Sequence, residues 1–180
     1  AKKYVEKNWG KNYGDVENLM FPITHKDSVK WYKEFLKERF SNFGTYQDAI
    51  VQGEDIMFHS GISPMQNVGL LLPDDIVDEA LKYGKKNKIK MNHIEGFVRQ
   101  IIGWREYSRY LYRYAYDDMK SNYFGHKRKL SKHWYDGSLG VLPIDDTIKT
   151  AFRTGYLHHI LRLMMMSNFM NLSQLHPDEV

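Results

Sequence analysis

The sequence has 180 residues, a length that fits one domain with a hydrophobic core of its own. It contains no cysteine, which excludes disulfides and thiolate-ligated metal clusters, and no apolar run approaches the roughly 20 residues of a transmembrane helix. The net charge of +4 is compatible with a polyanionic partner, and the start lacks the apolar core of a signal peptide, so a soluble cytoplasmic protein is expected.

The hydrophobic pattern predicts a mostly helical chain without strands. Residues 1–24 are expected to be irregular, because glycine and proline recur through polar sequence. A helix is predicted over 28–40, where Tyr32, Phe35, Leu36 and Phe40 recur at helical spacing. Residues 43–73, rich in glycine and proline, are expected to form a long connector.

The next helix is predicted over 74–83, opened by acidic residues and closed by Gly84, with a solvated basic loop behind it. The longest helix is predicted from Asn92 to Ala115, with Glu95 completing a capping box. A polar, basic connector over 119–143 and a pair of helices over 144–172 complete the chain.

The stretch FHSGISPMQNVGLL places small hydroxyl residues and glycine just before a predicted helix start at Pro64. Unpaired backbone N–H groups and the helix dipole at such a start favour an anion, so Ser60, Gly61 and Ser63 are candidates for a phosphate cradle. An ordinary serine cap on a short helix is the alternative.

The stretch EGFVRQIIGWREYSRYLYRY carries arginines on neighbouring turns of the long helix. Arginine pairs bidentately with phosphate, and Gly103 beside Trp104 would let another group approach the backbone closely. The alternative is a core helix with a salt-bridged outer face.

The apolar stretch TGYLHHILRLM contains His158, His159 and Arg162. On one helix, His159 would share a face with Tyr156, and two adjacent histidines would point about 100° apart, which does not favour a zinc site. Either these groups line a polar cavity, or one histidine belongs to the core and the other is exposed. The three methionines that follow are interpreted as soft core packing.

The basic stretch GHKRKLSKHW ends on an aromatic side chain, Trp134. It could follow a nucleic-acid backbone and stack a base, or it could be a solvated loop.

Together, five segments resemble the cofactor-binding half of the photolyase/cryptochrome family, in particular the prokaryotic branch of (6-4) photolyases and iron–sulfur cryptochromes. They cover nearly the whole chain in family order: FGTYQDAI, HSGISPMQNVGLLLPDDIV, EGFVRQIIGWREYSRYLY, WYDGSLGVLP, and GYLHHILRLMMMSNF with HPDEV. The resemblance implies an all-α, helical FAD-binding domain over 1–180, partial at its C-terminal side, with the N-terminal α/β antenna domain absent from this chain.

The resemblance assigns roles by position. Tyr46 matches a tyrosine at the adenosine end of FAD, and Trp104 a wall of the lesion pocket. His159 matches the proton donor to the lesion, and Arg162 matches an arginine near the flavin ring that is normally paired with an aspartate; with Trp104 they are the catalytic candidates. Trp134 or Tyr135 matches an electron-transfer aromatic. The segments that hold the rest of the cofactor comprise His59, Ser60, Gly61, Ile62, Ser63, Arg99, Gln100 and Arg105, joined by His159 and Arg162.

The function implied is a DNA photolyase-like lyase, with the (6-4) type favoured, in which light drives an electron from reduced FAD to a damaged pyrimidine pair in DNA. The alternatives are a cryptochrome-type photoreceptor without repair, and a degenerate helical domain that binds nucleic acid or protein. Pro143 stands where the iron–sulfur branch has a cysteine, so no iron–sulfur cluster and no other metal site is expected. Leu163 replaces the second histidine of the eukaryotic (6-4) enzymes.

Overall fold

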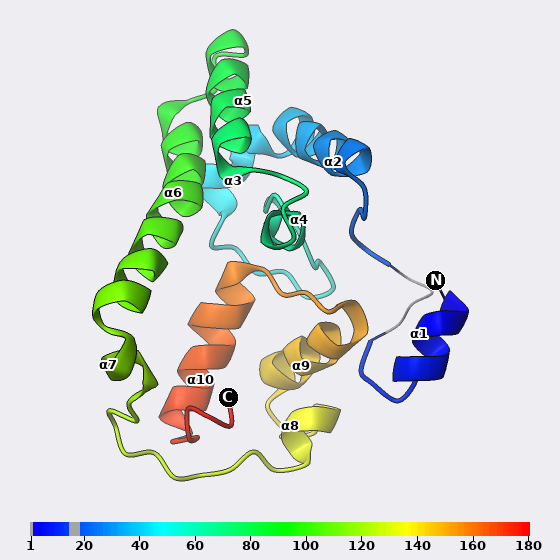
Figure 1. Ribbon diagram of the computed structural model, residues 1–180, viewed down its shortest axis with the longest axis vertical. Helices are drawn as coiled ribbons and strands as arrows, with labels where there is room; N and C mark the ends of the chain where they lie inside the picture. Colours follow the sequence, from blue (N-terminus) through cyan, green and yellow to red (C-terminus); the bar gives the residue numbers. More distant parts are fainter. Residues whose placement is uncertain (1, 15–18) are drawn as a thin grey trace. The chain divides into compact units, whose positions relative to one another are not determined.

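The computed structural model describes residues 2–14 and 19–180, shown in Figure 1. Within this part of the chain it contains helices and no strand, apart from one isolated bridge between Arg128 and Leu175. The predicted all-α fold class is therefore confirmed. Among the same residues, no helix combines the length and the apolar character needed to cross a membrane.

The chain divides into two compact units. Unit 1 comprises Ala1–Met20, Gln52–Asp55 and Phe124–Val180, and unit 2 comprises Phe21–Val51 and Ile56–Tyr123. Both units therefore combine segments that are distant in the sequence. The short piece Gln52–Asp55 is the only part of the middle of the described chain that joins unit 1.

Unit 2 is built around aromatic rings. Its helices are α2 (His25–Glu38), α3 (Phe40–Tyr46), α4 (Ser63–Asn67), α5 (Pro73–Lys86), α6 (Met91–Tyr114) and α7 (Tyr116–Lys120). The rings of Phe35, Phe40, Phe43 and Phe97 lie 5.1–6.0 Å apart in tilted or edge-to-face pairs, the arrangement that aromatic quadrupoles favour. The predicted helices over 28–40, 74–83 and 92–115 are confirmed, with ends that differ by a few residues.

The ends of these helices show where sequence signals were misleading. The Thr24 hydroxyl accepts a hydrogen bond from the Asp27 N–H, so α2 begins three residues earlier than predicted. The predicted capping box on α6 is wrong, because Lys90 occupies the N-cap position and its side chain makes no capping hydrogen bond. Gly84 does not end α5, since it is buried inside the helix.

The predicted connector over 43–73 is also wrong in part, because it contains most of α3 and all of α4. Helices of five to seven residues are too short to show a hydrophobic period. Gly44 allows α3 to press against the start of α6: a Cβ there would lie 2.3 Å from the Asn92 carbonyl oxygen. Its N–H donates to His93 Nδ1 at 3.0 Å.

Unit 1 contains α1 (Lys2–Trp9), α8 (His133–Asp136), α9 (Leu142–Thr154), the π-helix η1 (Ile160–Ser167) and α10 (Asn168–Leu172). Its core includes Trp134, Ile144, Ile148, Met166 and Leu175. The predicted irregular segment 1–24 is wrong at α1, a helix that buries none of its residues and so lacks an apolar face to recognise. Residues 1 and 15–18 of that segment lie outside the described residues.

Asp145 organises the turn between α8 and α9. Its carboxylate accepts hydrogen bonds from the N–H groups of Leu139 at 2.8 Å and Gly140 at 2.9 Å. Gly137 adopts a φ of +63°, and a Cβ there would lie 2.8 Å from the Asp145 carbonyl oxygen. The WYDGSLGVLP stretch is therefore a turn held by one buried carboxylate, and α8 lies inside the predicted connector.

The predicted final helix pair is confirmed as α9 followed by η1 and α10. The second helix begins later than the pattern indicated, because Gly155 ends α9 with a φ of +66° and residues 156–158 are not helical. Within η1 the hydrogen bonds widen: the Asn168 N–H donates to the Leu163 carbonyl, five residues back. Such π-helical segments are rare and occur often at functional sites.

Candidate functional site

The segment predicted to hold a phosphate is fixed to α2. The indole N–H of Trp31 donates to the Ser60 carbonyl at 2.8 Å. Gly61 follows with a φ of +64°, and a Cβ on it would lie 3.3 Å from the Trp31 ring. The tight turn before α4 therefore requires glycine for its conformation and leaves little room beside the indole.

The start of α4 carries no serine cap. Ile62 is the N-cap residue, Pro64 lies in the first turn, and no described side chain caps the helix. The alternative of an ordinary serine cap is therefore wrong, and the first N–H groups of α4 have no carbonyl partner within the helix. The Ser63 side chain is exposed at this position, whereas that of Ile62 is buried in the core of unit 2.

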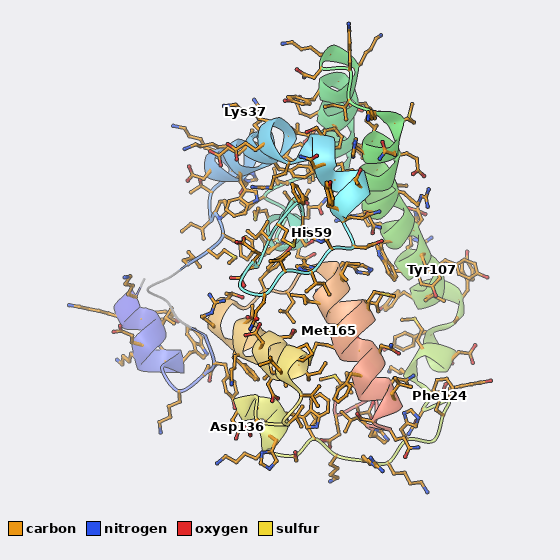
Figure 2. The ribbon with its side chains drawn as sticks, turned by 180° about the vertical axis from the view of Figure 1, so that it is seen from behind. Lys37, His59, Tyr107, Phe124, Asp136 and Met165 are labelled. Atoms are coloured by element: carbon orange, nitrogen blue, oxygen red, sulfur yellow. The ribbon has the colours of Figure 1, made fainter. Side chains whose placement is uncertain are left out.

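Two aromatic contacts hold the preceding residues against α3. The ring of Tyr46 stacks on Phe58 with centroids 5.1 Å apart, and His59 meets the edge of Phe43 at 6.3 Å. Figure 2 labels His59 within this part of the molecule. The structure thus brings Tyr46 together with the 58–61 segment, as a joint adenosine and diphosphate site would require.

The arginines of α6 divide between two environments. Arg99 forms an ion pair with Glu95, and Arg109 pairs with Glu106 at 3.5 Å, with all four side chains exposed. These two pairs match the alternative of a salt-bridged outer face. Arg105 is half-buried instead, and its guanidinium donates to the Ile101 carbonyl of the same helix at 2.9 Å.

Around Trp104 the helix surface is open. Trp104 is exposed and meets Tyr107, labelled in Figure 2, edge to face at 5.6 Å. A Cβ on Gly103 would meet only the Arg99 side chain, at 3.7 Å, among the described residues. No close approach to the Gly103 backbone is seen, so the glycine is not required there by packing. Gln100 is half-buried.

In unit 1 the two histidines differ in burial. His158 is buried in the segment before η1, and its Nδ1 lies 3.5 Å from the Leu161 N–H. His159 is half-buried at the N-cap of η1, and Arg162 is exposed. The expectation that Tyr156 shares a helical face with His159 is wrong, because Tyr156 lies outside the helix. One buried and one less buried histidine fit both alternatives for this stretch.

Burial lowers the pKa of His158, a nearby positive charge on His159 lowers it further, and the Asp55 carboxylate opposes both effects. His158 therefore favours the neutral form. Asp55 itself pairs with Arg153 at 3.1 Å. Sequence reasoning missed both Asp55 and Arg153, since nothing in their separation by 98 residues indicates contact.

The two candidate electron-transfer residues occupy different places. Trp134 is buried with its ring 5.7 Å from Phe169, which argues against the alternative that it stacks a base at the end of the basic stretch and leaves that of a solvated loop. Tyr135 is exposed and forms a cluster with Tyr13 and Phe152, in which the rings lie 4.1–6.5 Å apart. Lys127, Arg128 and Lys129 are exposed.

The predicted site residues fall into two sets. Unit 2 carries Tyr46, His59, Ser60, Gly61, Ile62, Ser63, Arg99, Gln100, Trp104 and Arg105. Unit 1 carries Trp134, Tyr135, His159 and Arg162. Contacts within unit 2 join Tyr46, Phe58, His59 and the turn at Gly61 into one surface with Trp31 beneath it.

Comparison with known proteins identifies two relatives. The chain is 35% identical to a (6-4) photolyase of Agrobacterium fabrum over 177 residues, which are 98% of this chain and 35% of that protein. It is 46% identical over 111 residues, 61% of this chain and 85% of the relative, to an uncharacterised protein, R853, of Acanthamoeba polyphaga mimivirus. No protein-family model matches the chain. The chain spans about a third of the length of the photolyase relative.

Proposed function

We propose that this chain, for which the similarity supports the photolyase/cryptochrome family, is the FAD-binding helical part of a light-driven DNA-repair lyase. One observation carries the proposal: 98% of the chain aligns with a protein described as a (6-4) photolyase. Because the chain covers only 35% of that relative, cofactor, substrate and reaction are all part of the proposal.

The residues of unit 2 fit the diphosphate of FAD. An uncapped helix start at α4, the exposed Ser63 hydroxyl and the turn at Gly61 offer hydrogen-bond donors to an anion. His59 and Ser60 would lie beside the diphosphate, and the Arg105 guanidinium would neutralise the negative charge of the diphosphate. Tyr46, whose ring stacks on that of Phe58, would contact the adenosine. When bound, FAD supplies the light absorption and the electron that repair requires.

The residues of unit 1 supply acid chemistry in this proposal. The His159 imidazolium would donate a proton from a ring nitrogen to the lesion, a task suited to a group whose ordinary pKa is near neutrality. The neutral state favoured by His158 avoids two positive charges side by side. Arg162 would act near the flavin, and Trp134 and Tyr135 remain the candidates for electron supply.

Damaged DNA is the proposed substrate, and a (6-4) photoproduct the proposed lesion. A lesion must leave the base stack to be reached, and the exposed indole of Trp104 offers a surface against which a flipped base can stack. No iron–sulfur cluster enters the proposal, since the chain has no cysteine to bind one.

The test is a visible-absorbance spectrum of the purified protein followed by a repair assay. We expect a flavin band at about one FAD per chain, and light-dependent repair of duplex DNA containing a (6-4) photoproduct. An identical sample kept in the dark is the control. A protein that cannot be loaded with FAD would contradict the whole proposal, while a flavoprotein that repairs nothing would indicate a photoreceptor instead.

A further inference from the structure

The outer face of α2 carries a row of lysines. Lys26, Lys30, Lys33 and Lys37 are spaced by four, three and four residues, which places them on one side of the helix. A shallow groove of about 330 Å³ lies along this row, and its lining is completed by Val29 and Glu34. Lys37, labelled in Figure 2, marks the end of the row. These four residues are called the lysine row.

The fold determines which way the lysine row faces. The opposite side of α2 is buried and consists of Ser28, Tyr32, Phe35 and Leu36. The Tyr32 hydroxyl also donates to the Ile76 carbonyl on α5 at 2.6 Å, which fixes the rotation of the helix about its axis. Because the buried side is fixed, the lysines must point away from the core of unit 2.

Most of the positive charge in the row is not neutralised. Lys30 lies 3.9 Å from Glu34. No carboxylate of the described residues forms an ion pair with Lys26, Lys33 or Lys37. The groove is lined by four ammonium groups and one carboxylate, so the electrostatic field of the groove attracts anions.

The same unit carries a second group of lysines, on α5. Directly after α2, the Phe40 ring packs 6.4 Å from Tyr83, in the C-terminal half of α5. That half of α5 carries Lys82, Lys85 and Lys86, all exposed. Unit 2 therefore carries exposed lysines at the end of α5 as well as on α2.

The composition of the row identifies its partner. Protein interfaces are depleted in lysine and depend on aromatic or arginine anchors, whereas this groove offers Val29 as its one apolar group among the lining residues. Lysines in a straight line of about 16 Å suit a linear polyanion whose charges repeat along an axis. We infer that the lysine row binds the phosphate backbone of duplex DNA, independently of sequence and of any lesion.

This contact goes beyond the proposed function, because it needs neither a flavin nor a damaged base. A backbone contact of this kind supplies non-specific affinity and lets a protein move along the duplex. A protein with the lysine row would bind undamaged DNA in the dark even if the flavin proposal failed. The failure of one proposal is thus distinguishable from the failure of the other.

The experiment measures binding of the full 180-residue chain to a fluorescein-labelled, undamaged 20-base-pair duplex by anisotropy in the dark, between 50 and 200 mM KCl. The test variant is K26Q/K33Q/K37Q, and the matched control is K3Q/K7Q/K11Q, which removes the same charge from exposed lysines at the N-terminal end. Circular dichroism and thermal unfolding verify that both variants remain folded.

We expect the test variant to bind at least about tenfold more weakly at 200 mM KCl, and its slope of log affinity against log salt to fall by about 2.7, while the control changes less. Glu34→Gln removes the one carboxylate of the groove and is expected to tighten binding. Equal losses in the test variant and the control would overturn the inference, since only net charge would then matter. Binding to polyglutamate is measured in the same way. If the test variant lost its binding to polyglutamate but not to the duplex, the inference would also be overturned, and an acidic protein partner would be indicated.

Discussion

The indole of Trp31 holds the carbonyl of Ser60 at 2.8 Å and lies against Gly61, so one side chain of α2 positions the turn that leads into α4. Trp31 itself packs on the core of unit 2 and has Phe21 as an aromatic neighbour at 5.7 Å. The proposed diphosphate segment therefore does not depend on its own short helix for its shape. It takes its shape from a tryptophan 29 residues earlier in the chain.

Trp31→Phe tests this relationship. Phenylalanine keeps an aromatic ring but removes the N–H, so the free energy of unfolding should fall by about 1–2 kcal/mol. If the segment holds FAD, the variant should also lose flavin more readily on dilution. Trp9→Phe, on the exposed helix α1, is the control and should change neither quantity. Unchanged stability in Trp31→Phe would show that the hydrogen bond does not fix the turn.

A pair of glycine substitutions should have opposite effects. In Gly44→Ala the new methyl group would lie 2.3 Å from the Asn92 carbonyl oxygen, which is backbone and cannot move aside. We expect a loss of about 1–3 kcal/mol despite the better helix propensity of alanine. Gly103→Ala meets only a flexible arginine side chain at 3.7 Å and should gain up to about 1 kcal/mol. Urea unfolding of both variants measures the difference, and equal signs would contradict this account.

The same contacts explain how far the sequence predicted the fold. Helices α2, α5 and α6 were recognisable because each buries one side against the aromatic core of unit 2, which leaves a helical period in the sequence. Helix α1 buries nothing, and α3 and α4 are shorter than two full periods, so no pattern marked them. Gly84 looked like a helix end because its packing role depends on the next helix, α6, where Ile94 would lie 2.6 Å from a Cβ on Gly84.

The candidate site shows the same difference between local features, which the sequence reveals, and long-range contacts, which it does not. Local features such as Gly61 before Pro64 were visible in the sequence because they act within one turn. The contacts of Trp31 with Ser60 and of Asp55 with Arg153 were not, since they join residues 29 and 98 positions apart. The π-helix was not predictable either: the stretch ILRLMMMS has an ordinary helical composition, and its wider hydrogen bonding appears only in the folded backbone.

Asp145 should be essential to the stability of unit 1. Its two carboxylate oxygens each accept one backbone N–H, and Asp145→Asn would replace one acceptor by an amide that faces a donor. We expect a loss of about 2–3 kcal/mol in the free energy of unfolding, because hydrogen bonds to a charged acceptor are strong. Asp146→Asn, the neighbouring carboxylate on the same helix, is the control and should stay within about 0.5 kcal/mol. Urea unfolding at neutral pH measures both, and similar losses would refute the role of Asp145.

Stability should fall in mild acid because of His158. Its pKa in the folded protein is lowered below the ordinary value, chiefly by burial, so the unfolded chain binds a proton more readily. The stabilisation is therefore fully present above about pH 6.5 and is lost as the pH falls through the folded pKa, with a slope of up to about 1.4 kcal/mol per pH unit. His93, whose pKa burial also lowers, adds a slope of the same sign.

Guanidinium unfolding at pH 7.5, 6.5 and 5.5 measures this dependence. His158→Gln should be less stable at pH 7.5 yet show a smaller decrease towards pH 5.5 than the unsubstituted protein. His133→Gln, which removes an exposed imidazole of the same unit, is the matched control. A pH dependence that is identical in His158→Gln and the unsubstituted protein would show that His158 does not cause it.

His159→Ala separates proton donation from cofactor binding. The side chain is half-buried at the start of η1 and does not belong to the core of unit 1 described above, so the variant should fold and retain its flavin. If His159 donates the proton to the lesion, repair of a (6-4) photoproduct should fall at least about 100-fold, the usual contribution of a general acid. Flavin absorbance and affinity for lesion-containing duplex should stay close to those of the unsubstituted protein, and His133→Ala should repair normally. Normal repair by His159→Ala would remove the proton-donor role, whereas loss of flavin together with repair would reassign His159 to the cofactor site.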